Sequence, residues 1–201
     1  MGKLPADRAA TVCGSCVRRG HLAVPMKAVL LSIGTELTRG ELIDTNAAWL
    51  SAELTDRGFD VVERRTVSDD PAEIGAAVRG MAKGRAVLVA TGGLGPTSDD
   101  RTAQAVAEGL GVAVERDLAV LDHIRRRYAH KGREMRELGA KQADRPAGSD
   151  VLQNSSGTAP GFAIVVEGCK CHFLPGVPSE MKEMFQVEVL PRIGDHATHD
   201  A

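Results

Sequence analysis

The run AVLVA (Ala86–Ala90) constrains the fold of this chain more than any other segment, because it is short, wholly apolar and followed at once by glycines. Such a run is typical of a strand that is buried on both faces of a parallel sheet. A similar run, Ala28–Ile33, lies upstream and ends at Gly34. A sheet made of such strands needs helices on both faces, so the sequence between and after them has to supply those helices.

Helix signals alternate with the strands along the first half of the chain. The segments Asp44–Asn46 and Ser68–Pro71 supply N-cap residues, and a proline suits the first turn of a helix. The predicted elements are a strand over Ala28–Ile33, a helix over Ala47–Arg57, a strand over Phe59–Val67, a helix from Pro71 to Lys83, a strand over Ala86–Ala90 and a helix from Asp100 to Leu110. This order, with short loops, predicts a three-layer α/β sandwich whose sheet is mostly parallel.

The second half of the chain is less regular. It predicts a helical pair over Asp117–Lys131 and Glu134–Ala143, then a hairpin of Gly161–Val166 with Cys171–Leu174, then a closing helix from Pro178 to Leu190. No repeat or linker interrupts residues 26–193, so we expect one domain there. We expect residues 1–25 to be a dispensable, poorly ordered extension and residues 194–201 to be a loose tail.

Composition excludes several classes of protein. The net charge of −2 gives no support for nucleic-acid binding, and no apolar run is long enough to span a membrane. Nothing resembles a secretory signal, so we expect a cytoplasmic protein with reduced thiols.

A zinc site could be formed by the four cysteines, Cys13, Cys16, Cys169 and Cys171. The first pair lies in the extension, however, and we do not expect a structural metal there. The basic segment Arg125–Arg133 fits a solvated helix face better than a phosphate or partner contact.

The loop TGGLGPTSDD (Thr91–Asp100) follows the buried strand and leads into a helix. Ligands of open parallel sheets bind beyond the carboxyl ends of the strands. Glycines allow backbone N–H groups to come close to a ligand, and a helix N-terminus attracts phosphate. The loop matches neither the Walker nor the GxGxxG pattern, yet its composition predicts an anion-binding site. No G-x-S-x-G motif accompanies Thr158 or Ser179, so we do not expect either residue to act as a nucleophile.

The two acids at the end of this loop admit two interpretations. Asp99 and Asp100 could simply cap the helix and complement its dipole. Alternatively, a carboxylate beside a phosphate site could hold a divalent cation such as Mg²⁺. Asp69 follows the second strand at the same edge of the sheet, so it could converge with Asp100 on one ion.

Three more segments are expected at this edge of the sheet, after Ile33, after Gln153 and after Phe173. Together with the glycine loop they give the predicted ligand-binding residues Gly34, Thr35, Glu36, Asp44, Asn46, Thr91, Gly92, Gly93, Gly95, Pro96, Thr97, Gly157, Thr158, Ala159, Pro160, Gly161, Pro175, Gly176, Ser179 and Glu180. We expect representatives of every segment, namely Thr35, Gly93, Asp100, Gly157 and Gly176, to share one pocket.

The chain resembles the N-terminal, molybdopterin-binding-like domain of the competence/damage-inducible protein CinA family. The resemblance covers about residues 26–193 and rests on several motifs that occur in order. They are SIGTEL, DTNAAWLSAEL, TVSDD, TGGLGPTSDDRT, KQA, GTAPGF and LPGVPSEMKEMF. The GGLG sequence favours the CinA branch over the relatives that adenylylate molybdopterin, which have GGTG.

The resemblance implies a site and three candidate functions. It places the two functional aspartates, both metal ligands and catalytic residues, at Asp69 and Asp100, and it leaves Asp99 as the helix cap. It implies a metal-dependent hydrolase of the pyrophosphate bond in ADP-ribose-like nucleotides. The alternatives are a protein that binds or adenylylates molybdopterin and a non-catalytic nucleotide-binding module. It also implies a homo-oligomer. Larger members carry a C-terminal amidohydrolase domain, which we do not expect in a chain that ends soon after its last helix.

Overall fold

The computed structural model describes residues 25–130, 132 and 134–194. The elements are β1 (Lys27–Ile33), α1 (Thr35–Thr38), α2 (Thr45–Asp56), β2 (Asp60–Val67), α3 (Pro71–Ala82), β3 (Val87–Thr91), α4 (Thr102–Leu110), β4 (Val114–Arg116), α5 (Leu118–His130), α6 (Glu137–Ala140), the 3₁₀ turn η1 (Lys141–Ala143), β5 (Asp144–Pro146), β6 (Asp150–Leu152), β7 (Gly161–Val166), β8 (Cys169–Leu174), α7 (Pro178–Met184), the π-helical turn η2 (Phe185–Val189) and α8 (Leu190–Ile193).

The central sheet has six strands in the order β2-β1-β3-β8-β7-β6. The four strands from β2 to β8 run parallel, while β7 is antiparallel to both of its neighbours. The predicted hairpin is confirmed, because β7 and β8 pair with each other across a turn at Glu167 and Gly168. The sheet is therefore mostly parallel, as the alternation of strands and helices indicates.

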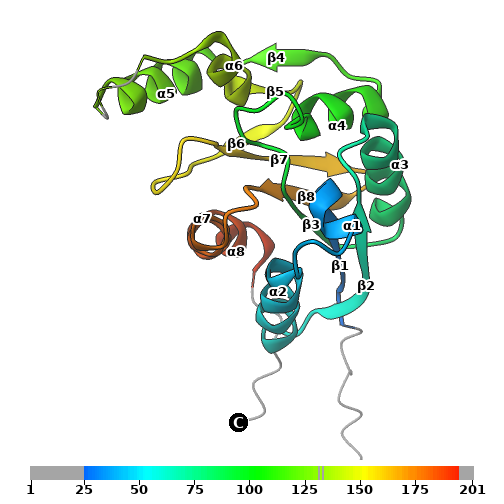
Figure 1. The fold of residues 1–201 in the computed structure, drawn as a ribbon. Helices are drawn as coiled ribbons and strands as arrows, with labels where there is room; N and C mark the ends of the chain where they lie inside the picture. The colour runs from blue at the N-terminus through cyan, green and yellow to red at the C-terminus, as the bar shows by residue number, and fades with distance from the viewer. Residues whose placement is uncertain (1–24, 131, 133, 195–201) are drawn as a thin grey trace, which may run out of the picture.

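Helices cover both faces of this sheet, which confirms the three-layer sandwich (Figure 1). On one face, side chains of α3 and α4 such as Ile74, Val78 and Val106 join the core of the sheet. On the other face, α2 contributes Leu50 and Leu54, and the last helices add a further group of buried residues, namely Met181, Met184, Phe185, Val189 and Ile193. Aliphatic side chains thus fill most of the core, as expected from an aromatic content of 3%.

The predicted helix caps are confirmed for two helices. Asp44 caps α2, since its Oδ1 accepts a hydrogen bond from the backbone N–H of Ala47 at 2.9 Å. Asp70 caps α3, where it accepts from the N–H groups of Ala72 and Glu73, and Pro71 occupies the first turn. A capping carboxylate of this kind stabilises a helix by about 1 kcal/mol.

The predicted cap at Asp99 is wrong. Helix α4 begins at Thr102 rather than at Asp100, and its N-cap position, Arg101, makes no side-chain cap. The N–H of Thr102 instead donates to the carbonyl of Gly93 at 3.1 Å, so the glycine loop itself satisfies the start of the helix. Asp99 is exposed and its only side-chain hydrogen bond among the described residues is a 3.3 Å contact from Ser98.

The predicted helix over Glu134–Ala143 is confirmed in part. Helical turns form over Glu137–Ala143, as the short helix α6 and the 3₁₀ turn η1, rather than as one continuous α-helix. The chain then enters β5, which pairs with β4 in a separate two-stranded sheet. These strands have three residues each, and β4 is fully exposed, so they carry no alternation that a sequence pattern could detect. Together with α5 and α6 they form a lobe at one end of the molecule (Figure 1).

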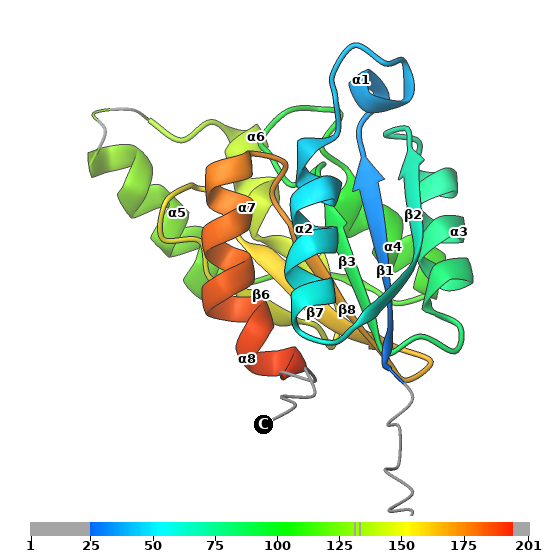
Figure 2. The same ribbon diagram turned by 90° about the horizontal axis from the view of Figure 1, so that it is seen from below.

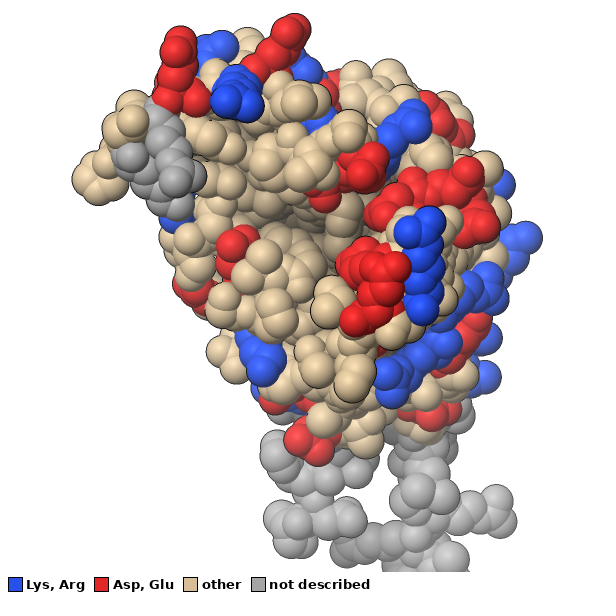
Figure 3. Space-filling model, viewed as in Figure 1, with Lys and Arg blue, Asp and Glu red and all other residues tan. Residues whose placement is uncertain are grey.

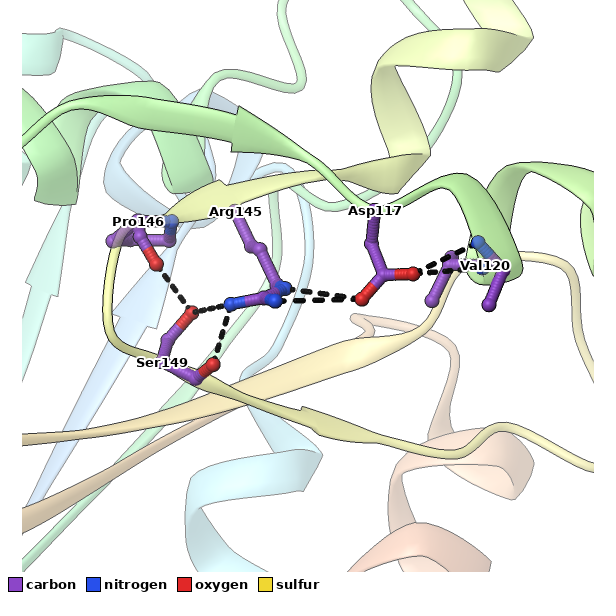
Figure 4. Close-up of polar contacts among 6 residues, drawn as sticks. Asp117, Val120, Arg145, Pro146 and Ser149 are labelled. Carbon is purple, nitrogen blue, oxygen red and sulfur yellow. Dashed lines mark hydrogen bonds and ion pairs between the residues drawn. The ribbon is translucent and has the colours of Figure 1, made fainter.

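An ion pair ties this lobe together (Figure 4). The Arg145 guanidinium lies 3.4 Å from Asp117 and also donates to the carbonyl oxygen of Ser149. The other oxygen of Asp117 accepts from the N–H groups of Ala119 and Val120 at the start of α5. Hydrogen bonds from this backbone, together with Arg145, hold the pKa of Asp117 below its usual value.

Two predictions concern residues outside the part that the structure describes. The extension, with Cys13 and Cys16, and nearly all of the predicted tail lie there. Cys169 and Cys171 are described, and both are buried free thiols on β8. Among the described residues, no helix is long and apolar enough to cross a membrane.

Candidate functional site

The register of the parallel strands brings four loops to one edge of the sheet. Ile33 pairs with Val67, while Thr91 pairs with both Ser32 and Leu174, so β1, β2, β3 and β8 all end at nearly the same level. Figure 2 shows α1 directly beyond the end of β1. The loops that follow these strands carry most of the predicted site residues, which explains how segments far apart in sequence meet.

These loops enclose a cavity of about 720 Å³, which we call the acidic cavity. The predicted residues that line it are Gly34, Glu36, Asp44, Asn46, Asp69, Thr91, Gly92, Gly93, Gly95, Pro96, Thr97, Asp100, Thr158, Ala159, Pro175, Gly176 and Glu180. Of the five residues expected to share one pocket, Gly93, Asp100 and Gly176 line it, whereas Thr35 and Gly157 do not.

The glycines of the loop are required by close packing within the protein. A Cβ on Gly92 would lie 2.1 Å from the carbonyl oxygen of Ile33, and one on Gly93 would lie 2.1 Å from Oγ1 of Thr102. Both residues also have positive φ, 109° and 66°, which strongly favours glycine. The tight turn leaves the N–H groups of Gly93, Leu94 and Gly95 without a hydrogen-bond partner among the described residues, so they are available to an anion.

One of the amides expected to bind phosphate is not available. The N–H of Gly92 donates to the carbonyl of Leu174 at 3.0 Å and thereby extends the ladder between β3 and β8. The loop amides that remain without a partner among the described residues are therefore those of Gly93–Gly95.

Asp69 and Asp100 are each held by two hydrogen bonds from one threonine. Oδ2 of Asp69 accepts from the N–H and the hydroxyl of Thr35, at 2.9 and 2.7 Å. Oδ2 of Asp100 accepts from the N–H and the hydroxyl of Thr97, at 2.8 and 2.6 Å. In each aspartate Oδ1 accepts no hydrogen bond from the described residues, so one oxygen fixes the carboxylate and the other is free to bind a ligand.

Three other polar residues of the cavity differ in how far they are engaged. Both oxygens of Asp44 are used, by Ser32 and by the cap of α2, so its role is structural. Asn46 donates through Nδ2 to the carbonyl of Gly176, and its Oδ1 is buried without a partner in the described chain. Oε2 of Glu180 accepts from Asn154, which leaves its second oxygen available.

The predicted residues that do not line the acidic cavity lie around it. Thr35 supports Asp69, as described above. A Cβ on Gly157 would lie 1.9 Å from Oε2 of Glu180, so this glycine makes room for that carboxylate. Pro160 and Gly161 line a second cavity instead. Ser179 lies in the first turn of α7, outside the lining of the acidic cavity.

Sequence reasoning missed several residues of the acidic cavity. Leu42, Ile43 and Val177 form an exposed apolar rim, with exposed fractions of 60%, 87% and 51%. Gln142 from η1 also lines it, although its segment is far from the glycine loop in sequence. The KQA motif contains Gln142, but no pattern in the sequence indicated that this segment reaches the site.

The electrostatics of the acidic cavity are one-sided. Six carboxylates line it, those of Glu36, Asp44, Asp69, Asp99, Asp100 and Glu180, and no Lys, Arg or His in the described part of the chain does so. Figure 3 shows the hollow in this face of the molecule with acidic side chains gathered beside it. A phosphate group placed here would meet like charge and would need a cation to neutralise it.

The residues present fit a divalent cation that is shared with a phosphorylated ligand. The described residues contain no group of three or more His, Cys, Asp or Glu that could hold an ion by itself. Mg²⁺, however, commonly keeps several waters and is bound by one or two carboxylates together with substrate phosphates. The free oxygens of Asp69 and Asp100 suit that arrangement, since both are hard ligands that line the same cavity.

The sequence is similar to a described family over most of its length. Residues 29–195 match the family described as a probable molybdopterin binding domain. A CinA-like protein of Geobacter metallireducens is 43% identical over 175 residues, which cover 85% of this chain and 42% of the relative. A putative competence-damage inducible protein of Caldicellulosiruptor saccharolyticus is 42% identical, over 83% of this chain and 40% of the relative. The chain thus spans less than half the length of these curated relatives.

Solved structures agree with this assignment. The crystal structure of CinA from Thermoplasma acidophilum, a protein described as having unknown function, is 34% identical and has a TM-score of 0.76. The match covers 81% of this chain and 95% of that one. The molybdopterin biosynthesis enzyme MoaB from Thermus thermophilus has a TM-score of 0.54 at 22% identity, over 83% of this chain and 92% of that one, and shows the shared fold.

Proposed function

The chain belongs to the molybdopterin-binding-domain family and, within it, to the CinA-like proteins, and we propose that it hydrolyses the pyrophosphate bond of ADP-ribose-like nucleotides with a divalent cation. In this reaction water adds across one P–O–P linkage, so that ADP-ribose would give AMP and ribose 5-phosphate. The fold alone does not select this reaction, because one fold hosts many chemistries. The proposal rests on the site.

The observation that carries the proposal is the combination of free loop amides with an acidic wall. The N–H groups of Gly93–Gly95 offer donors for phosphate oxygens, while six carboxylates and no basic side chain of the described chain face the same space. The carboxylates would repel a diphosphate alone. A diphosphate that carries a divalent cation would instead place its phosphate oxygens on the loop amides and its cation on the carboxylates. This pairing of donors and acids favours a metal–diphosphate complex as the ligand.

Each residue of the site has a defined task in the proposed reaction. Thr35 and Thr97 fix Asp69 and Asp100 by two hydrogen bonds each, so that the remaining carboxylate oxygens would hold the cation or orient the attacking water. The loop amides would bind the diphosphate in a fixed place, which lowers the entropic cost of reaction. A bound Mg²⁺ supplies charge neutralisation for the phosphate oxygens and a more acidic water molecule.

A second candidate function follows from the family description. A protein that binds molybdopterin, or adenylylates it with ATP and magnesium, would use the same amides for phosphate and the same aspartates for the cation. A third possibility is a module that binds nucleotide without turnover. The geometry of the cavity is compatible with all three, so substrate tests have to separate them.

The test is an assay of the purified protein with ADP-ribose, and separately with ATP plus molybdopterin, in magnesium and in EDTA. The proposal predicts that ADP-ribose is converted to AMP and ribose 5-phosphate in magnesium and not in EDTA. Adenylylated molybdopterin without cleavage of ADP-ribose would favour the second candidate. Binding of ADP-ribose without any turnover would leave the module as the correct description.

A further inference from the structure

A second cavity of about 320 Å³ shares the glycine loop with the acidic cavity. Leu94 and Gly95 line both, and the second cavity continues beneath α4 toward the β4–β5 lobe. Its walls include the apolar side chains of Val114, Val151 and Phe162. The cavity therefore combines an apolar wall with polar side chains, and a space of this kind and size is typical of a site for a small organic ligand.

The charged side chains that line the second cavity are mostly engaged within the protein. Lys141 donates through Nζ to the carbonyl of Thr97. Arg145 is held by Asp117 and Ser149 (Figure 4), and Asp144 pairs with Arg116 at 2.6 Å. Arg101, which is exposed and also lines this cavity, makes no side-chain hydrogen bond or ion pair with the described residues.

Gln142 is the residue of this lining whose buried side chain leaves an acceptor without a hydrogen-bond partner among the described residues. Its side chain is only 7% exposed, and Nε2 makes a long hydrogen bond of 3.5 Å to the carbonyl of Leu94. Oε1 is buried and has no hydrogen-bond partner among the described residues. An unpaired buried carbonyl destabilises the protein, so a ligand group that donates a hydrogen bond to it would be bound in preference to one that cannot. Gln142 lines both cavities and so stands where they meet.

We propose that the second cavity binds the flat nitrogen heterocycle of the ligand, and that Oε1 of Gln142 accepts a hydrogen bond from an N–H group on its edge. This inference rests on the proposed function, which places the phosphates of the same ligand on the amides of Gly93–Gly95. The last side-chain torsion of glutamine is broad, so the carbonyl of Gln142 can adjust its direction to such a donor. Gln142 is therefore a specificity-determining residue.

The chemistry of the cavity selects this class of ligand. The apolar side chains of Val151 and Phe162 suit the faces of an aromatic ring. Adenine, guanine and pterin all carry N–H donors on the ring edge, and the buried, unpaired Oε1 of Gln142 favours a ligand with such a donor. The shared chemistry is therefore a planar heterocycle with an edge N–H.

The experiment measures binding by calorimetry in magnesium, for the wild type and for Gln142→Leu. The probes are AMP, GMP, ribose 5-phosphate, which lacks a heterocycle, and 6-hydroxymethylpterin, which lacks phosphate. Gln142→Leu keeps the size of the side chain and removes the acceptor, and thermal melting checks that it folds. Gln186→Leu, the same change on an exposed helical position outside both cavities, is the matched control.

The inference predicts that the wild type binds at least one heterocyclic probe more tightly than ribose 5-phosphate. It predicts that Gln142→Leu weakens that probe about 10-fold or more, which corresponds to about 1.4 kcal/mol, and leaves ribose 5-phosphate unchanged. The heterocycle that loses most identifies the natural class. Equal losses for probes with and without a ring, or no advantage for any ring, would overturn the inference. If pterin binding depends on Gln142 but no phosphorylated probe binds, the inference survives and the proposed function fails.

Discussion

Two threonine–aspartate pairs define the chemistry of this site at the scale of single residues. Thr35 with Asp69 and Thr97 with Asp100 repeat one geometry, in which a backbone N–H and a hydroxyl grip a single carboxylate oxygen. Such a grip fixes the direction of the second oxygen without adding a positive charge. Under the proposed function, these two free oxygens are the ones that would bind the cation.

Replacement of Asp100 by Asn tests this role. Asn keeps the shape and an oxygen that can accept from Thr97, but it removes the charge that a cation needs. We expect Asp100→Asn to lose at least about 100-fold in turnover, because one ligand of the cation is gone, and to change the free energy of unfolding by less than about 1 kcal/mol. Steady-state kinetics and urea denaturation measure the two effects.

Asp60→Asn is the matched control for that change. Asp60 is exposed at the start of β2 and lies outside the acidic cavity, so the same substitution there should leave both turnover and stability near the wild-type values. An active Asp100→Asn protein would contradict the assignment of Asp100.

For single residues, the sequence predicts a place in the site only when the residue directly follows a recognisable strand. The glycine loop and the loop with Asp69 were predicted in this way, since parallel strands place their carboxyl ends together. Asp99 was predicted to cap α4, but the helix starts two residues later because the carbonyl of Gly93 receives the N–H of Thr102. Gln142 reaches the site through tertiary packing of η1, for which no local pattern exists.

At the scale of elements, the contact between α3 and α4 depends on two glycines. A Cβ on Gly109 would lie 2.6 Å from the Cα of Gly75, so the two helix backbones approach each other more closely than any side chain allows. The contact lies from the middle to the end of α4, where Ala105 and Gly109 meet Gly75. It holds the two helices side by side on one face of the sheet.

The two helices permit a paired test with one kind of substitution. Gly109→Ala should destabilise the fold by about 1–3 kcal/mol, because backbone rather than a flexible side chain has to move. Gly80→Ala, on an exposed turn of α3 with nothing within 4 Å of the added Cβ, should stabilise it by about 0.5–1 kcal/mol. Urea denaturation measures the free energy of unfolding of both variants. Equal changes of the same sign in the two variants would contradict the role of the contact between α3 and α4.

The sequence predicts a helix or strand well when its hydrophobic period, its capping residues and its length all indicate the same element. It predicts short elements that lack these signals poorly. The helix α3 has an apolar face, an Asp70 cap and a Pro71 start, and its predicted limits differ little from those observed. The lobe of β4, β5 and α6 consists of pieces of three or four residues that are stabilised by tertiary contacts such as Arg145–Asp117. Local sequence carries no comparable signal for such short elements.

At the scale of the whole molecule, one buried histidine makes stability depend on pH. His172 on β8 is 2% exposed, and burial, aided by the positive charges of Arg192 and Lys170, lowers its pKa from 6.5 to about 4. The unfolded chain therefore binds a proton below about pH 6.5 that the folded chain does not bind until about pH 4. Folding stability is unaffected above this window and falls as the pH drops through it.

We expect the free energy of unfolding to decrease by roughly 2 kcal/mol between pH 7 and pH 5 through this histidine. His172→Leu, which cannot take up a proton, should make the dependence on pH in this range much flatter, whatever its effect on stability at pH 7. Urea denaturation at several pH values measures both slopes. Parallel curves for the two proteins would contradict the assignment to His172.

The structure confirms the predicted architecture of the chain, whereas the predicted oligomeric state is untested. Alternating strands and capped helices determine a three-layer sandwich, and the structure confirms it. A homo-oligomer is expected from the family resemblance, and the exposed rim of Leu42, Ile43 and Val177 offers apolar surface for a contact between copies. Light scattering over a range of concentrations measures the oligomeric state, and a monomer at every concentration would contradict it.

We propose that the acidic cavity binds a phosphorylated ligand only together with a divalent cation, because six carboxylates and no basic side chain of the described residues line it, while the amides of Gly93–Gly95 have no partner there. The decisive measurement is a calorimetric titration of the wild-type protein with a non-hydrolysable ADP-ribose analogue, whose bridging oxygen is replaced by a methylene group, in magnesium and in EDTA at equal ionic strength. We expect binding in magnesium and an affinity at least about 100-fold weaker, a loss of about 2.7 kcal/mol, in EDTA. Equal affinity in magnesium and in EDTA would show that the cation is not needed for binding.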